Sequence, residues 1–267
     1  MFGINPQNRE VYPHNFIRSV YLRATYTSTQ QCSDSRERFV DLFADVMPKV
    51  DDTSAVKIEL NNKGNKIEAD ESAHRLVLHS NDMQKEMSFA NDECTYTVSG
   101  LDYKDFEEVS KQYQKALFFA QTCGVHTLSS LSLRKVNVVQ FKGEITEGDS
   151  IVPIHGALSE LVGKELLFSY EARKSINPYI KQSMQSIILK DQEYELTIKY
   201  GVEALRREDN SKKLSGIVVI DLTMKKNQVA MDSLKDELVK FNNEIFSAFR
   251  WTLSDAAIKL LRGQNGI

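Results

Sequence analysis

Residues 16–27 read FIRSVYLRATYT, and apolar and polar side chains alternate along this segment. Phe16, Val20, Leu22, Ala24 and Tyr26 fall on one side, and Ser19, Tyr21, Arg23 and Thr25 fall on the other. A period of two residues predicts a β-strand with one buried and one exposed face. A second segment of this kind, LSSLSLRKVNVVQFK, occupies residues 128–142. Each of these strands is expected to open a similar series of elements.

The chain after the first strand predicts a short helix, several short strands and a long helix. Apolar residues recur at helical spacing at Phe39, Leu42, Phe43, Val46 and Met47, with Ser33 or Ser35 as the cap and Pro48 as the stop. Short β-like runs cover residues 56–60, 75–79, 86–89 and 95–98, and turn-forming residues lie at 61–65 and 91–93. The long helix is expected to be capped by Asp102, to carry an apolar stripe (Phe106, Val109, Tyr113, Ala116, Leu117 and Ala120) and to end before Gly124.

The chain after the second long strand predicts the same order of elements. A short helix is expected at residues 156–162, with Leu158, Leu161 and Val162 facing inward. Strands are expected at residues 165–173, 185–189, 194–205 and 214–225, with turns at Asp191-Gln192 and at residues 209–211. A long helix with Leu234, Leu238, Phe241, Ile245, Phe246 and Phe249 on one side should then break near Thr252–Asp255 and continue to about Leu261.

This repeated order predicts an α+β fold built from two related halves, residues 1–126 and 127–267. Each half is expected to be an antiparallel β-sheet covered by a long amphipathic helix, with the order β-α-β-β-β-α repeated. An antiparallel sheet with one apolar face needs such a cover. The two halves should pack together as one unit, because no linker separates them.

Composition favours a folded protein of the cytosol. The chain has 267 residues, of which 41% are hydrophobic and 27% charged, so it can bury a full core. The formal net charge of -3 disfavours nucleic acid and anionic membrane surfaces as partners. No secretory signal or transmembrane run is recognisable. Three cysteines without a Cys-x-x-Cys pair favour reduced, buried thiols.

Several short patterns resemble a known family. They are Tyr12-Pro13 leading into Ile17 to Tyr26, the helix ending at Pro48, the run Leu133-Arg134-Lys135-Val136-Asn137, Ile220-Asp221, and the closing helix from Phe246 to Trp251. Over nearly the whole chain these patterns resemble a sporadically distributed bacterial family of uncharacterised proteins. The resemblance implies no activity and no catalytic residues. The chain has Lys135 where the family pattern, similar to Leu-Arg-Tyr-x-Asn, usually has an aromatic residue.

Three residues are the candidates for a ligand site: Arg23, Arg134 and Asp221. Asp221 lies in a very apolar strand and could act as a base with a raised pKa if buried. A buried carboxylate opposite Arg134 or Arg23 would favour an active site. Arg134 and Asn137 are three residues apart on a strand, so they should face opposite sides. Convergence of the three candidates in a cavity would favour ligand binding, and dispersal would favour a scaffold.

Other chemical signatures are weak. Cys123 and His126 could form a nucleophile and base, but Gly124 ends a helix there, which favours a small apolar role for Cys123. The five histidines, His14, His74, His79, His126 and His155, are not spaced as metal ligands, so no metal or cofactor is expected. Arg206-Arg207, Lys212-Lys213 and Lys225-Lys226 could form a basic rim, although charged hairpin tips are ordinarily solvated.

These observations predict a non-enzymatic interaction or scaffold protein of the cytosol, with a protein partner or a second copy as its ligand. The alternative is a small-molecule-binding protein or an enzyme with a polar pocket between sheet and helix. That pocket would be built from Arg23, Arg134 and Asp221. Binding to nucleic acid is a third hypothesis, and it predicts an affinity that falls steeply with salt.

Overall fold

The computed structural model describes residues 1–13, 15–27, 32, 35–61, 64–146, 158, 160–167, 182–206 and 213–263. The strands are β1 (Ile17–Tyr26), β2 (Lys49–Asn61), β3 (Gly64–His79), β4 (Lys85–Phe89), β5 (Glu93–Ser99), β6 (Thr127–Thr146), β7 (Gln182–Asp191), β8 (Tyr194–Arg206) and β9 (Lys213–Ala230). The helices are α2 (Arg36–Phe43), α3 (Phe106–Thr122), α6 (Leu234–Thr252) and α7 (Asp255–Leu261), with short 3-10 turns η1 (Lys164–Leu166) and η3 (Met231–Ser233).

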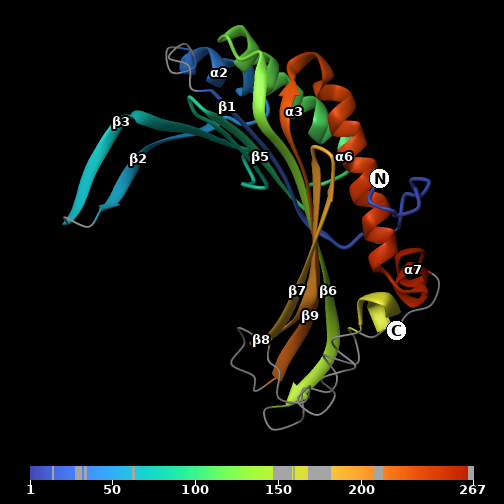
Figure 1. The fold of residues 1–267 in the computed structure, drawn as a ribbon. Coiled ribbons are helices and arrows are strands. Elements are labelled where there is room, and N and C mark those ends of the chain that lie inside the picture. The colour runs from blue at the N-terminus through green and yellow to red at the C-terminus, as the bar shows by residue number, and fades with distance from the viewer. Residues whose placement is uncertain are drawn as a thin grey trace. The chain divides into compact units, whose positions relative to one another are not determined.

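The strands form one antiparallel sheet, so the α+β class is confirmed (Figure 1). The order of the nine strands is β2-β3-β4-β5-β1-β6-β9-β8-β7. The sequence pattern predicts one antiparallel sheet in each half, the two sheets being joined or closely packed, and the structure has the strands of both halves joined in a single sheet. The physical reason is that β1 and β6, the long strands that open the two halves, are neighbours and hydrogen-bond to each other.

The chain forms two compact units that do not follow the sequence halves. Unit 1 contains residues 1–18, 134–224 and 240–267, and unit 2 contains residues 19–133 and 225–239. Each unit draws on both halves of the sequence. The predicted division near residue 126 as an evolutionary or folding boundary stays a prediction.

The core of unit 2 lies between strands and helices, and the buried faces of β1 and α3 are those predicted from the sequence pattern. In β1 the side chains of Val20, Leu22, Ala24 and Tyr26 are buried, as the alternation predicts. In α3 the whole predicted stripe is buried. Four phenylalanines from α2, β4 and α3 form its aromatic centre. The ring of Phe39 stacks on Phe89 with centroids 4.3 Å apart, and it contacts Phe43 at 5.0 Å and Phe119 at 5.3 Å.

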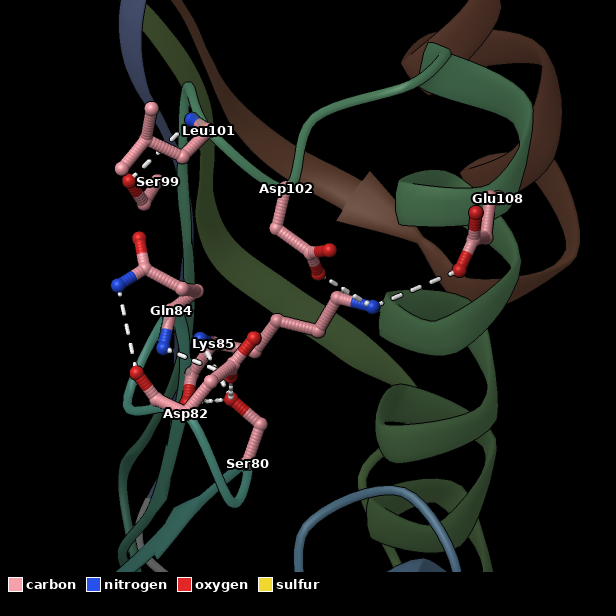
Figure 2. Close-up of polar contacts among 8 residues, drawn as sticks. All are labelled: Ser80, Asp82, Gln84, Lys85, Ser99, Leu101, Asp102 and Glu108. Atoms are coloured by element: carbon pink, nitrogen blue, oxygen red, sulfur yellow. Dashed lines mark hydrogen bonds and ion pairs between the residues drawn. The ribbon is translucent and has the colours of Figure 1, made fainter.

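The start of α3 differs from the prediction in its capping residue. Asp105 caps the helix, because its side chain accepts a hydrogen bond of 2.8 Å from the backbone N–H of Glu108. The predicted cap, Asp102, lies further upstream and instead pairs with Lys85 at the start of β4, at 2.8 Å. Figure 2 shows the Lys85 ammonium between Asp102 and Glu108, and the latter carboxylate is 3.6 Å away. Lys85 therefore ties the first turn of α3 to the sheet.

The turn before Lys85 is held by its own side chains (Figure 2). Ser80 Oγ donates to Asp82 at 2.6 Å and accepts from the backbone N–H of Lys85 at 2.9 Å. Asp82 also accepts from the N–H of Gln84 at 3.1 Å. Met83 takes the positive φ of 59° that the tight turn requires. This network fixes the direction in which β4 enters the sheet.

β2 and β3 are longer than the short runs predicted at residues 56–60 and 75–79. They pair from Lys49 with His79 to Asn61 with Gly64, with a register shift between Ser54 and Val56. Of β3, only the last residues, from Leu76 to His79, pair with β4. The rest is a two-stranded ribbon that extends beyond the sheet, drawn in cyan in Figure 1.

In unit 1 the N-terminal segment is bound to the C-terminal helices by ion pairs and a ring contact. The Glu10 carboxylate accepts from Arg262 at 2.7 and 2.9 Å and from Arg250 at 3.0 Å. Hydrogen bonds from Arg262, the largest favourable contribution, lower the pKa of Glu10 to about 2. The ring of Tyr12 stacks on Phe246 at 6.3 Å. The predicted break between the last two helices is confirmed, with Ser254 as the cap of α7.

Some predictions fall on residues that the structure does not describe, and one is wrong in part. Outside the described residues lie His14, His155, the turn at residues 209–211, Arg207 and Lys212 of the basic rim, and most of the segment 143–153. The strand predicted at residues 165–173 begins instead as the 3-10 turn Lys164–Leu166. Leu158, Leu161 and Val162 are buried, as predicted.

Candidate functional site

Unit 2 presents a polar sheet face opposite the side that packs on α3. Tyr113 of α3 donates to the carbonyl of Cys94, which places the helix on the face of the buried residues Cys94, Tyr96 and Val98. The alternating positions form the other face, here called the open face. Its members are Tyr21, Arg23 and Thr25 on β1, Glu93, Thr95 and Thr97 on β5, Glu86 and Ser88 on β4, and Arg75 on β3.

Two arginines meet one buried carboxylate on the open face. Glu93 has a side chain only 11% exposed, whereas those of Arg23 and Arg75 are 61% and 45% exposed. Arg23 binds Glu93 Oε2 through Nε at 2.6 Å and Nη2 at 2.5 Å. Arg75 donates from Nη2 to Oε1 at 2.7 Å. Glu93 thus holds two guanidinium groups in fixed positions while leaving much of their surface in contact with water.

Ser88 lies on the same face, next to this cluster. It pairs with Thr95 of β5, which in turn lies opposite Arg23 of β1, and on its other side it pairs with Val77 of β3. Ser88 is 2% exposed, and within the described part of the chain its hydroxyl has no hydrogen-bond partner. A buried polar group without a partner is costly, so it points to a ligand or to a special role.

Unit 1 carries a second arginine and carboxylate pair, and both members were candidates. Arg134 of β6 forms a bidentate ion pair with Asp221 of β9, at 2.8 and 2.7 Å. The Asp221 side chain is 9% exposed and that of Arg134 is 46% exposed. Asn137 lies on the other side of β6, is buried, and donates to the carbonyl of Ile220 at 3.2 Å. The opposite orientation predicted for Arg134 and Asn137 is confirmed.

Lys135, next to Arg134, faces α6 and is buried. Its ammonium donates to Asn242 Oδ1 at 2.6 Å, and Asn242 is itself 2% exposed. Burial, together with repulsion by Arg9, lowers the pKa of Lys135 to about 7. The sheet and α6 therefore enclose a polar contact at this position.

Replacing Lys135 by methionine is expected to raise the free energy of unfolding, and to raise it most at low pH. The folded pKa of about 7 lies below the ordinary 10.5, so the unfolded chain binds more protons between these values. Wild-type stability therefore rises with pH across this window, while below it the desolvation cost is present in full. Denaturation of both proteins at about pH 6 and about pH 9.5 measures the difference. If Lys135→Met gains more free energy of unfolding at the higher pH than at the lower pH, the lowered pKa of Lys135 is wrong. Lys199→Met, at an exposed lysine, is the control.

The cysteines and histidines that were considered as nucleophiles or metal ligands have surroundings typical of residues with a structural role. Cys32, Cys94 and Cys123 are buried and form no disulfide, as predicted, and burial raises the pKa of the Cys94 thiol well above its ordinary value. Cys123 is the C-cap residue of α3, before Gly124 with its φ of 92°. His79 Nε2 lies 3.2 Å from Asp51. Among the described residues, no three His, Cys, Asp or Glu side chains are grouped to hold a metal ion.

The structure brings together two of the three predicted site residues, Arg134 and Asp221. The third, Arg23, belongs to unit 2 and pairs with Glu93. Each arginine therefore faces a different buried carboxylate, Asp221 for Arg134 and Glu93 for Arg23. Glu93, Arg75 and Ser88 were missed. The interval 91–93 has turn residues, which hid the fact that β5 begins at Glu93 and that this side chain continues the open face.

No protein-family model matches the chain, and no curated protein matches it in sequence. The resemblance to the sporadically distributed bacterial family therefore stays a prediction. Across the part of the chain that is described, no helix combines the length and the apolar character needed to span a bilayer.

Proposed function

We propose that this protein is a non-enzymatic binding protein that recognises a protein partner through the open face of unit 2. The proposal includes the cytosolic location expected from the sequence. One observation carries it: Glu93 is buried between Arg23 and Arg75, whose guanidinium groups stay half-exposed. Donors held in place before binding lose little entropy when a partner arrives. Arginine is also enriched among the residues that dominate binding energy at interfaces.

The surroundings of these arginines favour binding over catalysis. Thr95 and Thr97 flank them and are partly exposed, and Tyr21 is 36% exposed. Hydroxyl groups, an aromatic ring and guanidinium groups suit recognition of polar groups. Among the described members of the open face none is a cysteine, and His79, which lies opposite Glu86, contacts carboxylates (Asp51 at 3.2 Å and Glu86 at 3.9 Å). Catalysis by nucleophile and base needs the two groups within hydrogen-bond reach of each other.

Capture of partners from the native cells tests the proposal with two matched variants. Thr97→Arg places a long charged side chain on the open face, whereas Lys111→Glu changes an exposed residue of α3. We expect the wild type and Lys111→Glu to retain the same partner, and Thr97→Arg to lose it. Light scattering on the purified chains should detect self-association if the partner is a second copy. Circular dichroism checks that both variants fold.

Two results would refute the proposal. One is the absence of any partner and of any self-association in the wild type. The other is a partner that Thr97→Arg retains at full strength while Lys111→Glu loses it, since binding would then occur on the helical side of unit 2.

A second candidate function rests on the buried polar contact in unit 1. Lys135, Asn137 and Asn242 lie between the sheet and α6, where an apolar core is ordinary. This favours the alternative of a small-molecule-binding protein or enzyme with a polar site between sheet and helix. A thermal-shift screen with metabolites and nucleotides tests it, because a ligand that binds the native state raises the midpoint temperature of unfolding. If the Lys135→Met variant shows the same ligand-induced rise in unfolding temperature as the wild type, the ligand does not bind at the polar contact between the sheet and α6.

We also propose that the two halves arose by duplication. In the first half the opening strand β1 lies beside the closing strand β5, and in the second half β6 lies beside β9. A long helix follows each closing strand, α3 in one half and α6 in the other. The same pairing of first and last strands, followed in each half by a long helix, supports a common origin, although the first half has one strand more.

A further inference from the structure

We propose that Arg23, Arg75 and Ser88 form a binding site for a phosphate monoester on the open face of unit 2. This inference rests on the proposed function and deepens it, since it names the chemical group that the open face recognises. Three strands contribute one donor each: Arg23 from β1, Arg75 from β3 and Ser88 from β4.

Arg23 provides the first donors. Its contacts to Glu93 use Nε and Nη2, so among the described residues its Nη1 group keeps both N–H donors for a ligand. The side chain is 61% exposed, which leaves this group accessible. Because Glu93 holds the planar guanidinium in place, the donors are already oriented. Guanidinium groups bind phosphate oxygens through paired, charge-assisted hydrogen bonds.

Ser88 provides an independent indication of a ligand. Its hydroxyl is buried and has no hydrogen-bond partner among the described residues. A serine in this position is expected to bond to a strand neighbour or to water, because buried polar groups are nearly always satisfied. Ser88 belongs to β4, and β4 and β5 lie between the strands of Arg75 and Arg23, so a ligand that contacts both arginines lies over these two strands. A hydroxyl can donate to such an oxygen.

The arrangement favours a tetrahedral oxyanion over a carboxylate. The donors lie on three different strands of one sheet face, and a planar carboxylate has only two oxygens to share among them. Glu93 already occupies the space between the two guanidinium groups as a carboxylate. A phosphate group can place separate oxygens toward Arg23, Arg75 and Ser88 at once.

Calorimetric titration of the full chain at constant ionic strength tests the site. The probes are inorganic phosphate, a peptide with one phosphoserine, its unphosphorylated form, and acetate. We expect saturable binding of the phosphate probes and none of the unphosphorylated peptide or acetate. A preference for the phosphopeptide identifies a phosphorylated protein segment as the source, and equal affinity for inorganic phosphate identifies the free anion.

Three variants locate the site. Arg23→Gln should weaken phosphate binding by about 10- to 100-fold, the usual effect of losing a charged hydrogen bond. Ser88→Ala should weaken it by about 5- to 10-fold and should not lower the melting temperature of the free protein, because no partner loses a bond and a costly buried hydroxyl is removed. Lys199→Gln removes an exposed positive charge from unit 1 and should change nothing.

No saturable binding of either phosphate probe, or equal binding of acetate, would overturn the site. So would unchanged affinity in both Arg23→Gln and Ser88→Ala. If the wild type retains a partner but binds no phosphate, the anion site is refuted and the proposed function stands. If phosphate binds at this site but no partner or self-association exists, the proposed function is refuted and the site stands.

Discussion

Replacing Phe39 by alanine is expected to lower the free energy of unfolding by about 3 to 5 kcal/mol. Phe39 is fully buried and its ring contacts Phe43, Phe89 and Phe119. Removing it takes away burial and leaves a cavity between α2, β4 and α3 that their backbones cannot close. Urea denaturation followed by circular dichroism measures the loss.

Phe118 is the matched control for Phe39, because it is the same residue type but 46% exposed on α3. Phe118→Ala should change the free energy of unfolding by about 0.5 kcal/mol or less, as most surface substitutions do. A loss in Phe39→Ala below about 1 kcal/mol would mean that the aromatic cluster does not hold α2 to the sheet. Equal losses in the two variants would mean the same.

Replacing Gly201 by alanine is expected to separate β7 from β8. The added Cβ would overlap the Ser183 carbonyl oxygen and lie 2.8 Å from the Cα of Met184, which pairs with Gly201. Backbone atoms cannot turn away as a flexible side chain can, so the strands must move apart. We expect a loss of about 3 kcal/mol, at the upper end of the usual cost of overpacking. Hydrogen exchange should show faster exchange of the β7 amides.

Gly163→Ala is the control in the same unit. Its added Cβ would meet a flexible atom first, Glu165 Oε2 at 3.3 Å, and then a carbonyl at 3.4 Å. The φ of -59° at Gly163 suits alanine. A change of under about 1 kcal/mol is expected. If Gly201→Ala proves as mild as Gly163→Ala, the close approach of β7 to β8 is wrong.

The candidate site was predictable in part. Arg134 and Arg23 stood out as arginines within strands, and Asp221 as a carboxylate in an apolar strand. The residues that pair with them could not be predicted from the sequence. Asp221 is 87 residues from Arg134 in the sequence, and Glu93 is 70 residues from Arg23. Pairing of this kind depends on which strands become neighbours and in which register. No local spacing encodes that, and Arg75 and Ser88 were missed for the same reason.

Capping gives a smaller example of the same limit. Asp102 and Asp105 both precede α3, and both have the side chain that caps a helix. Asp105 takes the role because Lys85, brought close by the pairing of β4 with β5, binds Asp102.

The sequence by itself determined which segments become strands and helices and which of their faces are buried. The alternation in residues 16–27 and the stripe of α3 follow from the two repeat distances of the backbone, which act over a few residues. Only the tertiary structure decided that all strands join in one sheet, that Glu93 holds two arginines, and that Ser88 is buried without a partner. These features depend on hydrogen bonds between strands far apart in the chain, and each such contact exists only once the sheet has formed.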